Sequence, residues 1–426
     1  MSSSDKKVLI LTYYWPPSGG SGVQRWVYFA KYLNRLGWEP IVLTVDESQA
    51  SYASFDRSLE KEVKGIRVIK TPTREPLRWY SRITTGNPKQ GIPQGAVPQK
   101  GLFAKIAAYI RGNFFIPDAR KGWVPYAVQA ANEILSTENI STLITTGPPH
   151  STHLAGLALA KSFPLNWWVD YRDPWTDLFY NHHFYRSARS KLKDAAYERE
   201  VLTTATGVIT TLSQGLHDDL RRKGAKGKCI ALPNGYDAEL MQATPPASST
   251  SHFHVVYTGL LTSNQDYVPL VDSLQALSSN YTIRFSLAGN ISANIIEEIR
   301  NTLPRVEVIY HGYLEHKQAI ALMKSGDVLL NFIFRGAENQ MISGKLLEYM
   351  ATQVPILSLG DPESEVGQLL MQGTAAQMVT AHNTKGQIDF LEQCAKNPQK
   401  NIYLDADKWS RKALTHRLIN EVLASA

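Results

Sequence analysis

Short apolar runs rich in β-branched residues alternate with segments of helical periodicity over residues 1–235. Buried strands are indicated by the runs KVLILTYY, PIVLTV, IRVIKT, STLITTG, NWWVDY, TGVITTLS and CIALPNG. In VQRWVYFAKYLNRLG, which follows the first run, apolar residues recur at helical spacing as far as the stop signal Gly37. Continuous apolar strands separated by helices are typical of a doubly wound parallel sheet, so we expect an α/β fold.

This alternation is interrupted at residues 236–252, whose Pro, Ser, Thr and Ala indicate a linker. It starts again with FHVVYTG, TIRFSLAG, VEVIYHG, DVLLNFI and VPILSLG, which predict the strands of a second parallel sheet. We therefore expect two Rossmann-like αβα domains, at 1–235 and 253–404, facing an interdomain cleft. Ligands of such sheets bind outside the carboxyl ends of the strands.

The last segment, 405–426, contains an amphipathic helix that could return to the first domain. Asp405-Ala-Asp407 stands next to this helix and not at the end of a strand. We therefore expect Asp405 or Asp407 to cap the helix N-terminus rather than to bind a metal ion.

The composition is that of a folded chain of two or three domains, because 43% of the 426 residues are hydrophobic and 19% are charged. These values exclude a disordered or low-complexity protein. Cys229 and Cys394 are the only cysteines, which excludes a disulfide framework or paired-cysteine zinc site and indicates a reducing compartment. No run reaches the roughly 18 apolar residues of a transmembrane helix. The first run is too short for a signal-peptide core, so we expect a cytoplasmic protein.

Positive charge is concentrated in the first half of the chain. Residues 1–235 contain 31 Lys and Arg against 19 Asp and Glu, whereas residues 236–426 contain 14 against 19. The stretch 64–128 alone has 12 basic and two acidic residues, and it overlaps a basic insertion that we expect at residues 72–125. This distribution favours a phosphate-rich partner or an anionic membrane surface, with a solvated basic face as the alternative.

A glycine-rich loop, SGGSG at 18–22, follows the first predicted strand and opens a helix. Glycines let the backbone approach a phosphate closely, and a helix N-terminus favours negative charge. A dinucleotide-binding fingerprint would need a third glycine where Arg25 stands. The residues leave open a diphosphate-binding loop, a dinucleotide-binding loop and a structural turn.

Two polar clusters follow later strands of the first domain. They are Gly147-Pro-Pro-His150-Ser-Thr-His153 and Asp170-Tyr-Arg172-Asp173-Pro-Trp175. Because charged groups are costly to bury unpaired, the second cluster either holds its loop by an Arg–Asp pair or faces the cleft and acts on a hydroxyl-bearing substrate. His150 and His153 have no third ligand in an obvious motif, so we expect no metal ion.

A third cluster, Gly344-Lys345-Leu-Leu-Glu348, begins a predicted helix of the second domain. Lys345 and Glu348 are three residues apart and share a helix face, which is also the spacing of an ordinary helical ion pair. A lysine near a helix start is unfavourable unless an anion is present. Glu348 could accept hydrogen bonds from the vicinal hydroxyls of a ribose.

These motifs together make the sequence resemble a family-4 retaining glycosyltransferase of the two-domain GT-B architecture over nearly its whole length. The resemblance is carried by YYWPPSGGSGVQR, TTGPPHSTHLAG, VDYRDPW, ALPNGYD, VVYTGLL and SGKLLEYMATQVPILSLG. It extends to the bacterial branch that builds surface polysaccharides such as capsule and lipopolysaccharide, where YIRGNFFIPDARKGW has a similar counterpart.

The resemblance implies that the second domain binds a nucleotide-diphosphate sugar and the first a glycan acceptor, lipid-linked in this branch. It implies retention of the anomeric configuration and neither a metal nor another cofactor; we expect no nucleic-acid partner. The implied donor-binding residues are Gly20, Gly22, Gly259, Gln340, Ser343, Gly344, Lys345 and Glu348, with Lys345 by the phosphates and Glu348 on the ribose. Asp173, His150 and Arg172 are the candidate catalytic residues.

The sequence departs from the family pattern at three places. Gln340 stands where the family has a second glutamate, the loop after Gly259 contains no cation, and Arg172-Asp173 replaces a histidine. The charge of a departing diphosphate would then be stabilised by Arg335, Lys345, Arg25 or Arg172.

LFAKIAAYIRGNFFI, within the basic insertion, places Leu102, Phe103, Ile106, Ile110 and Phe114 near one helical stripe, with Lys105 and Arg111 among the polar positions. This helix either lies on the inner face of the cell membrane, near a lipid-linked acceptor, or packs on the sheet.

Two alternatives to a transferase remain: a nucleotide-sugar epimerase of the same fold, and a catalytically inactive GT-B binding subunit.

Overall fold

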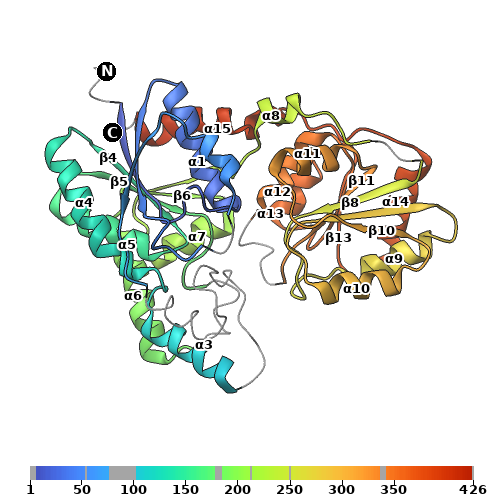
Figure 1. Cartoon of the computed structure of the whole chain (residues 1–426), viewed down its shortest axis with the longest axis horizontal. Helices are drawn as coiled ribbons and strands as arrows, with labels where there is room; N and C mark the ends of the chain where they lie inside the picture. The colour runs from blue at the N-terminus through green and yellow to red at the C-terminus, as the bar shows by residue number, and fades with distance from the viewer. Residues whose placement is uncertain are drawn as a thin grey trace. The chain divides into compact units, whose positions relative to one another are not determined.

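The computed structural model describes residues 6–52, 55–75, 102–177, 185–211, 214–248, 251–335 and 342–424. The chain forms two compact units, Met1–Pro233 with Leu414–Ala426, and Asn234–Ala413. Each unit is built around one parallel sheet (Figure 1), which confirms the predicted fold class of two Rossmann-like α/β domains. Within the described ranges, no helix is both long and apolar enough to cross a membrane.

The first unit contains a seven-stranded sheet in the order β3-β2-β1-β4-β5-β6-β7. Its strands are β1 (Lys7–Leu11), β2 (Glu39–Val45), β3 (Arg67–Thr71), β4 (Thr142–Gly147), β5 (Asn166–Tyr171), β6 (Gly207–Thr210) and β7 (Lys228–Ala231). The chain runs outward from β1 to β3 and then crosses back, so that β4 pairs with the other edge of β1. The carboxyl ends of β1 and β4 therefore form the topological switch point at which ligands of such sheets bind.

Helices cover both faces of this sheet because side chains alternate along each buried strand. Leu9 and Leu11 of β1 belong to a core cluster with four helices, α4 (Val124–Thr137), α5 (Ser151–Ser162), α6 (Ala188–Thr204) and α7 (Gln214–Lys223). Val8 and Ile10 belong to a second cluster with α1 (Ser21–Arg35) and α15 (Arg411–Leu418). A further helix, α3 (Leu102–Phe114), precedes α4 in the chain.

The second unit contains a six-stranded sheet in the order β10-β9-β8-β11-β12-β13. Its strands are β8 (Phe253–Thr258), β9 (Ile283–Ala288), β10 (Glu307–Tyr310), β11 (Val328–Phe332), β12 (Ile356–Leu359) and β13 (Ala376–Val379). Its helices are α8 (Ala238–Ala243), α9 (Val268–Leu277), α10 (Ala293–Thr302), α11 (His316–Lys324), α12 (Gly344–Thr352), α13 (Glu365–Leu370) and α14 (Thr384–Lys396). The switch point lies between the central strands β8 and β11.

The core of the second unit also has two faces. One face packs against α9, α10 and α14 through a cluster that includes Val255 and Tyr257 of β8, whereas α11 and α12 lie on the other side of the sheet (Figure 1). The chain from β11 enters α12 at Gly344, so the N-terminus of α12 follows the carboxyl end of a central strand. This topology places the Lys345 and Glu348 motif at the switch point.

Candidate functional site

The start of α12 is fixed to the end of β8 by a buried tyrosine. The backbone N–H of Thr258 donates a hydrogen bond to the Tyr349 hydroxyl at 2.8 Å. Lys345 lies one helical turn before Tyr349, which brings its side chain over Gly259, the residue after β8. A Cβ at Gly259 would lie 3.2 Å from Lys345 Cδ. Gly259 therefore lets the lysine approach the strand end closely.

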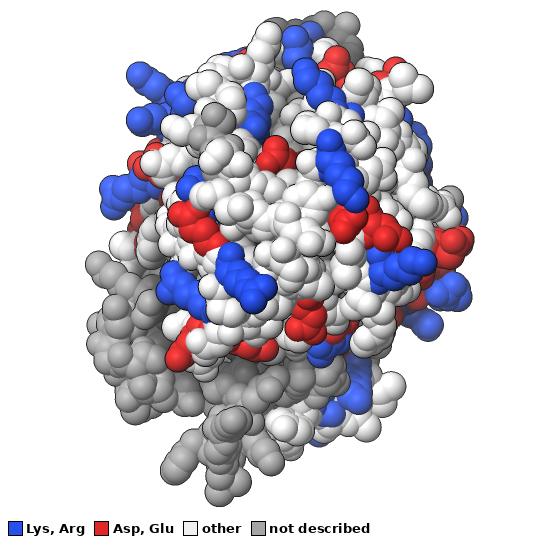
Figure 2. Space-filling view, turned by 90° about the vertical axis from the view of Figure 1, so that its right-hand side faces the viewer, with Lys and Arg blue, Asp and Glu red and all other residues white. Residues whose placement is uncertain are grey.

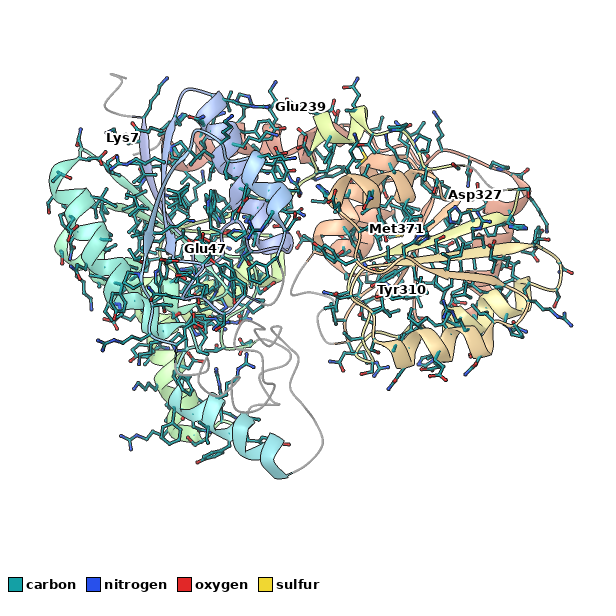
Figure 3. All side chains as sticks on the ribbon, viewed as in Figure 1. Lys7, Glu47, Glu239, Tyr310, Asp327 and Met371 are labelled. Carbon is teal, nitrogen blue, oxygen red and sulfur yellow. The ribbon has the colours of Figure 1, made fainter. Side chains whose placement is uncertain are left out.

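The backbone of Gly259 lies in close contact with a second glycine, Gly289. Gly289 follows β9 with φ +119°, and a Cβ there would lie 2.1 Å from the carbonyl oxygen of Gly259. The Gly289 carbonyl accepts a hydrogen bond from the Tyr310 hydroxyl at 2.9 Å, and Tyr310 is labelled in Figure 3. The strand ends of β8, β9 and β10 are thus linked to one another, which makes a fixed backbone floor beside α12.

Lys345 is a half-buried cation with an aromatic neighbour. Its Nζ lies 3.9 Å from the centroid of the Tyr257 ring, and burial lowers its pKa to about 7. Within the described residues, its ammonium group forms neither an ion pair nor a hydrogen bond. A charge that has lost its hydration without gaining a carboxylate favours an anionic ligand.

The N-terminus of α12 has the same preference for an anion. Ser343 is the N-cap residue, but its side chain makes no capping hydrogen bond, and the first turn contains no acidic residue. The buried Ser343 Oγ has no hydrogen-bond partner among the described residues. Backbone N–H groups at a helix start carry a partial positive charge, so this end of α12 and Lys345 favour negative charge at one place.

Glu348, one turn after Lys345, is a buried and anchored carboxylate. Its Oε1 accepts a hydrogen bond from His316 Nε2 at 2.7 Å and lies 3.5 Å from Arg411 Nη2. Burial alone would raise the pKa of Glu348, but His316 and Arg411 outweigh this effect and hold the pKa below its usual range. The glutamate is therefore ionised at neutral pH, and it does not form the alternative ion pair with Lys345.

The second unit thus brings together Gly259, Ser343, Gly344, Lys345 and Glu348, while their roles in donor binding stay a prediction. Gln340 lies outside the described residues. His316 and Arg411 were missed, because they come from α11 and from the start of α15, 32 and 63 residues away from Glu348. No local pattern connects them to α12, and only the tertiary fold could have revealed them.

In the first unit, three strand-end loops meet around Arg172. The Arg172 side chain donates hydrogen bonds to the carbonyl oxygens of Gly147, at 3.0 Å, and Pro148. A Cβ at Gly22, in the first turn of α1, would lie 1.9 Å from Arg172 Nη1. A side chain at Gly22 would therefore displace the guanidinium group, whereas Gly20 adopts φ +109° and a Cβ there would meet nothing within 4 Å.

His150 belongs to a cluster of stacked rings after β4 and β5. Its ring lies parallel to Trp175 with centroids 5.1 Å apart, and His153 stacks on Tyr171 at 5.2 Å. Burial lowers the pKa of His150 well below its usual range and that of His153 to about 3. Both imidazoles are therefore neutral.

Asp173 lies half-buried next to Arg172. Burial raises the pKa of its carboxyl, and the positive charge of Arg172 opposes that shift. The structure thus brings Gly22, His150, Arg172 and Asp173 to the same edge of the first sheet, while their roles stay a prediction.

Asp170 has a structural role that the sequence left open. Its buried carboxylate accepts hydrogen bonds from Arg25 at 2.8 Å, Trp26 at 2.6 Å and Thr146 at 2.8 Å. Arg25 also donates to the Leu232 carbonyl at 2.6 Å. The residue that replaces the third glycine of a dinucleotide fingerprint therefore joins α1 to β5, and its charge is neutralised within the first unit.

Metal-binding residues are not grouped in the described part of the chain, where no set of three or more His, Cys, Asp or Glu side chains is arranged to hold an ion.

The comparisons with known proteins give matches in structure only. No protein-family model matches the chain, and no curated protein matches it. Among solved structures, sucrose-phosphate synthase from Thermosynechococcus elongatus is 13% identical, with a TM-score of 0.66 over 99% of this chain and 100% of that one. HepE from Anabaena in complex with UDP-glucose is 12% identical, with a TM-score of 0.57 over 98% and 96%. The lipopolysaccharide outer core galactosyltransferase WaaB is 11% identical, with a TM-score of 0.57 over 99% and 100%. The chain therefore has the GT-B fold of these proteins.

Proposed function

We propose that this chain is a GT-B glycosyltransferase that uses a nucleoside-diphosphate sugar as its donor. The observation that carries the proposal is Lys345, a half-buried cation with no carboxylate partner among the described residues. It lies at a helix N-terminus without a side-chain cap, one turn before the ionised Glu348. A nucleoside diphosphate offers an anion and a pair of ribose hydroxyls about one helical turn apart, which fits this arrangement.

Each candidate donor-binding residue of the second unit then has a role. Lys345 and the N–H groups of Ser343 and Gly344 bind the phosphates, and Gly259 leaves room beside them. Glu348 accepts hydrogen bonds from the ribose hydroxyls. When the bond to the sugar breaks, negative charge develops on the diphosphate, and Lys345 stabilises that charge more strongly than it would in water. From the resemblance in sequence, we assign Gln340 to the sugar ring.

The first unit is proposed to bind a glycan acceptor. Asp173 and His150 would contact the acceptor or the transferred sugar, and Arg172 would add positive charge next to them. Neutral His150 can accept or donate a hydrogen bond, and the raised pKa of Asp173 suits a group that exchanges protons with a hydroxyl. Gly20 and Gly22 are assigned to the donor diphosphate by the resemblance in sequence. We propose transfer with retention, without a metal or other cofactor, in surface polysaccharide synthesis.

A lipid-linked acceptor would bring the protein to the cytoplasmic face of the membrane. The described end of α3 exposes Ile110 and Phe114, and α6 exposes Leu192. Asn113 Oδ1 joins the two helices by accepting hydrogen bonds from Ser187 N and Ser190 Oγ. By contrast, the face of the molecule shown in Figure 2 carries both basic and acidic side chains. We therefore assign membrane contact to α3 and α6; sedimentation with anionic liposomes at low salt tests it, and no co-sedimentation would refute it.

The test of the function begins with calorimetric binding of UDP, GDP, ADP and TDP to the purified protein. We expect one of them to bind, and Glu348→Ala to weaken that binding with the fold intact. Unchanged binding by this variant would refute the assigned site. Incubation of the matching nucleotide sugar with and without a cell-lipid extract then separates the activities: a transferase releases nucleotide only with an acceptor, an epimerase converts the donor alone, and an inactive binding subunit does neither.

A further inference from the structure

We propose that His316 positions Glu348 so that its second carboxylate oxygen recognises a ribose hydroxyl of the donor. This inference rests on the proposed function and extends it to a residue outside the α12 motif. His316 does not touch the ligand in this proposal but acts through Glu348.

The contact between the two side chains is short and buried. His316 Nε2 donates to Glu348 Oε1 at 2.7 Å, and the side chains are 11% and 10% exposed. His316 is the first residue of α11, and a capping box formed by Glu315 and Gln318 fixes that helix end. Because His316 belongs to a capped helix that lies beside α12 (Figure 1), the position of its imidazole is set before any ligand binds.

Among the described residues, the hydrogen bonds and ion pairs of the Glu348 carboxylate all involve one oxygen, Oε1. Arg411 Nη2 also approaches Oε1, but at 3.5 Å, so His316 makes the stronger of the two bonds. The terminal torsion of a glutamate is broad in the absence of such a bond. A bond on Oε1 alone fixes the carboxylate plane and leaves Oε2 to accept from a ligand.

The charges around Glu348 agree with this role. His316 and Arg411 favour its ionised form, and Asp237, the N-cap of α8, opposes them. An ionised carboxylate in a desolvated place accepts strong hydrogen bonds from hydroxyl groups. Loss of one hydroxyl from the ligand should then weaken binding by about ten- to a hundredfold, the effect of a hydrogen bond to a charged group.

The experiment compares ligands as well as variants. The dissociation constants of UDP, GDP or ADP, whichever binds, are measured together with those of its 2′-deoxy and 3′-deoxy forms. We expect the wild type to prefer the complete ribose strongly and His316→Phe to bind all three forms with closely similar affinity. His316→Gln should restore most of the preference, since its amide nitrogen reaches about as far as Nε2.

A matched control is offered by His254, a buried histidine at the start of β8. It contacts the Ser325 carbonyl at 2.9 Å and Ser286 Oγ at 2.8 Å, away from the carboxyl ends of the strands. His254→Gln should reduce stability and leave the hydroxyl preference unchanged. Should His316→Phe not fold, His316→Asn, whose amide is one carbon shorter than that of glutamine, replaces it.

Two results would overturn the inference in different ways. If His316→Phe folds and keeps the wild-type preference for the complete ribose, His316 has only a structural role, and the proposed donor site stands. If the wild type binds none of UDP, GDP, ADP and TDP, the proposed function fails, and the inference fails with it.

Discussion

Buried charges in this chain differ in how completely the protein surrounds them. Asp170 is fully buried and accepts hydrogen bonds from Arg25, Trp26 and Thr146. Lys345 is half-buried, and among the described residues its ammonium group has the face of Tyr257 beside it but no carboxylate. A charge whose bonds are complete within the protein stabilises one conformation, whereas an incompletely surrounded charge is available to a ligand.

The first prediction concerns the buried pair of Arg25 and Asp170. Asp170→Asn should lower the free energy of unfolding by about 3–5 kcal/mol, because it removes a carboxylate that neutralises the buried Arg25 guanidinium. Glu200→Gln is the matched control, since Glu200 pairs with Lys161 at 2.6 Å where both side chains are about half exposed, and it should cost at most about 1 kcal/mol. Urea unfolding of both variants measures the difference, and equal losses would contradict a structural role for Asp170.

The second prediction concerns the pH dependence of nucleotide binding. Burial lowers the pKa of Lys345 to about 7 in the free protein, and a bound diphosphate should raise it again. Above pH 7.5 the ligand's phosphates are ionised, so the affinity should fall as the pH rises and Lys345 loses its proton. Linkage to one proton limits the fall to about tenfold per pH unit.

Calorimetry between pH 7.5 and 9.5 measures this dependence, and Lys345→Arg serves as its control. An arginine keeps its charge over that range, so the variant should give a flat profile. A wild-type profile as flat as that of the variant would show that Lys345 does not bind the phosphates in its protonated form.

The sequence predicted the relative positions of residues well where those residues lie on the same helix. The three-residue spacing of Lys345 and Glu348 correctly placed them on one face of α12. His316 and Arg411 could not be predicted, because their contacts with Glu348 depend on how distant elements pack. The predicted N-cap at Asp405 or Asp407 was wrong: α15 begins later, and Ser410 Oγ accepts the hydrogen bond from Ala413 N at 3.2 Å.

At the scale of elements, the edge beside α12 depends on successive glycines. Gly259, Gly289 and Gly312 follow three neighbouring strands, all with positive φ. Gly259 N donates to Ala288 O at 2.8 Å, and Gly289 N donates to Gly312 O at 2.7 Å. The sequence predicted strands that end at these glycines. It did not predict that the carbonyl group of Gly259 occupies the space that a side chain at Gly289 would need.

The third prediction tests this backbone floor. Gly289→Ala should lower the free energy of unfolding by about 1–3 kcal/mol, because alanine is strained at positive φ, and it should weaken nucleotide binding by displacing the Gly259 carbonyl. Gly215→Ala is the control, since a Cβ at this position of α7 meets nothing within 4 Å, and alanine favours a helix. Thermal unfolding and nucleotide titration of both variants measure these effects. Full nucleotide affinity in Gly289→Ala would contradict the importance of this edge.

At the scale of the molecule, the chain leaves the first unit after Pro233 and returns to it at Leu414. The two parallel sheets could be predicted from their apolar runs, since each buried strand is continuous in sequence. The order of the strands could not, because β1 and β8 become central only when the chain crosses back over the sheet. The segment predicted as a linker also contains α8, whose six residues are too few for a clear helical period.

One face of the returning segment packs into the core of the first unit through apolar side chains. Leu414, Leu418 and Val422 are all fully buried in the cluster that contains Trp26 and Ile10. This cluster joins residues near both ends of the chain, so the first unit can complete its core only after the second unit has been synthesised. The terminal segment therefore stabilises the fold of the first unit although it is the last part of the sequence.

The fourth prediction measures that contribution. Leu418→Ala should lower the free energy of unfolding by about 2–5 kcal/mol, because it leaves a cavity between α15, α1 and the sheet. Leu404→Ala removes the same atoms from a side chain that is 85% exposed and should change the stability by less than about 0.5 kcal/mol. Both variants are compared by urea unfolding, followed by the fluorescence of the tryptophans. Because Glu348 and Lys345 lie in the other unit, Leu418→Ala should bind nucleotide with wild-type affinity under conditions where it remains folded. A loss of affinity in the folded variant would mean that the core of the first unit contributes to donor binding.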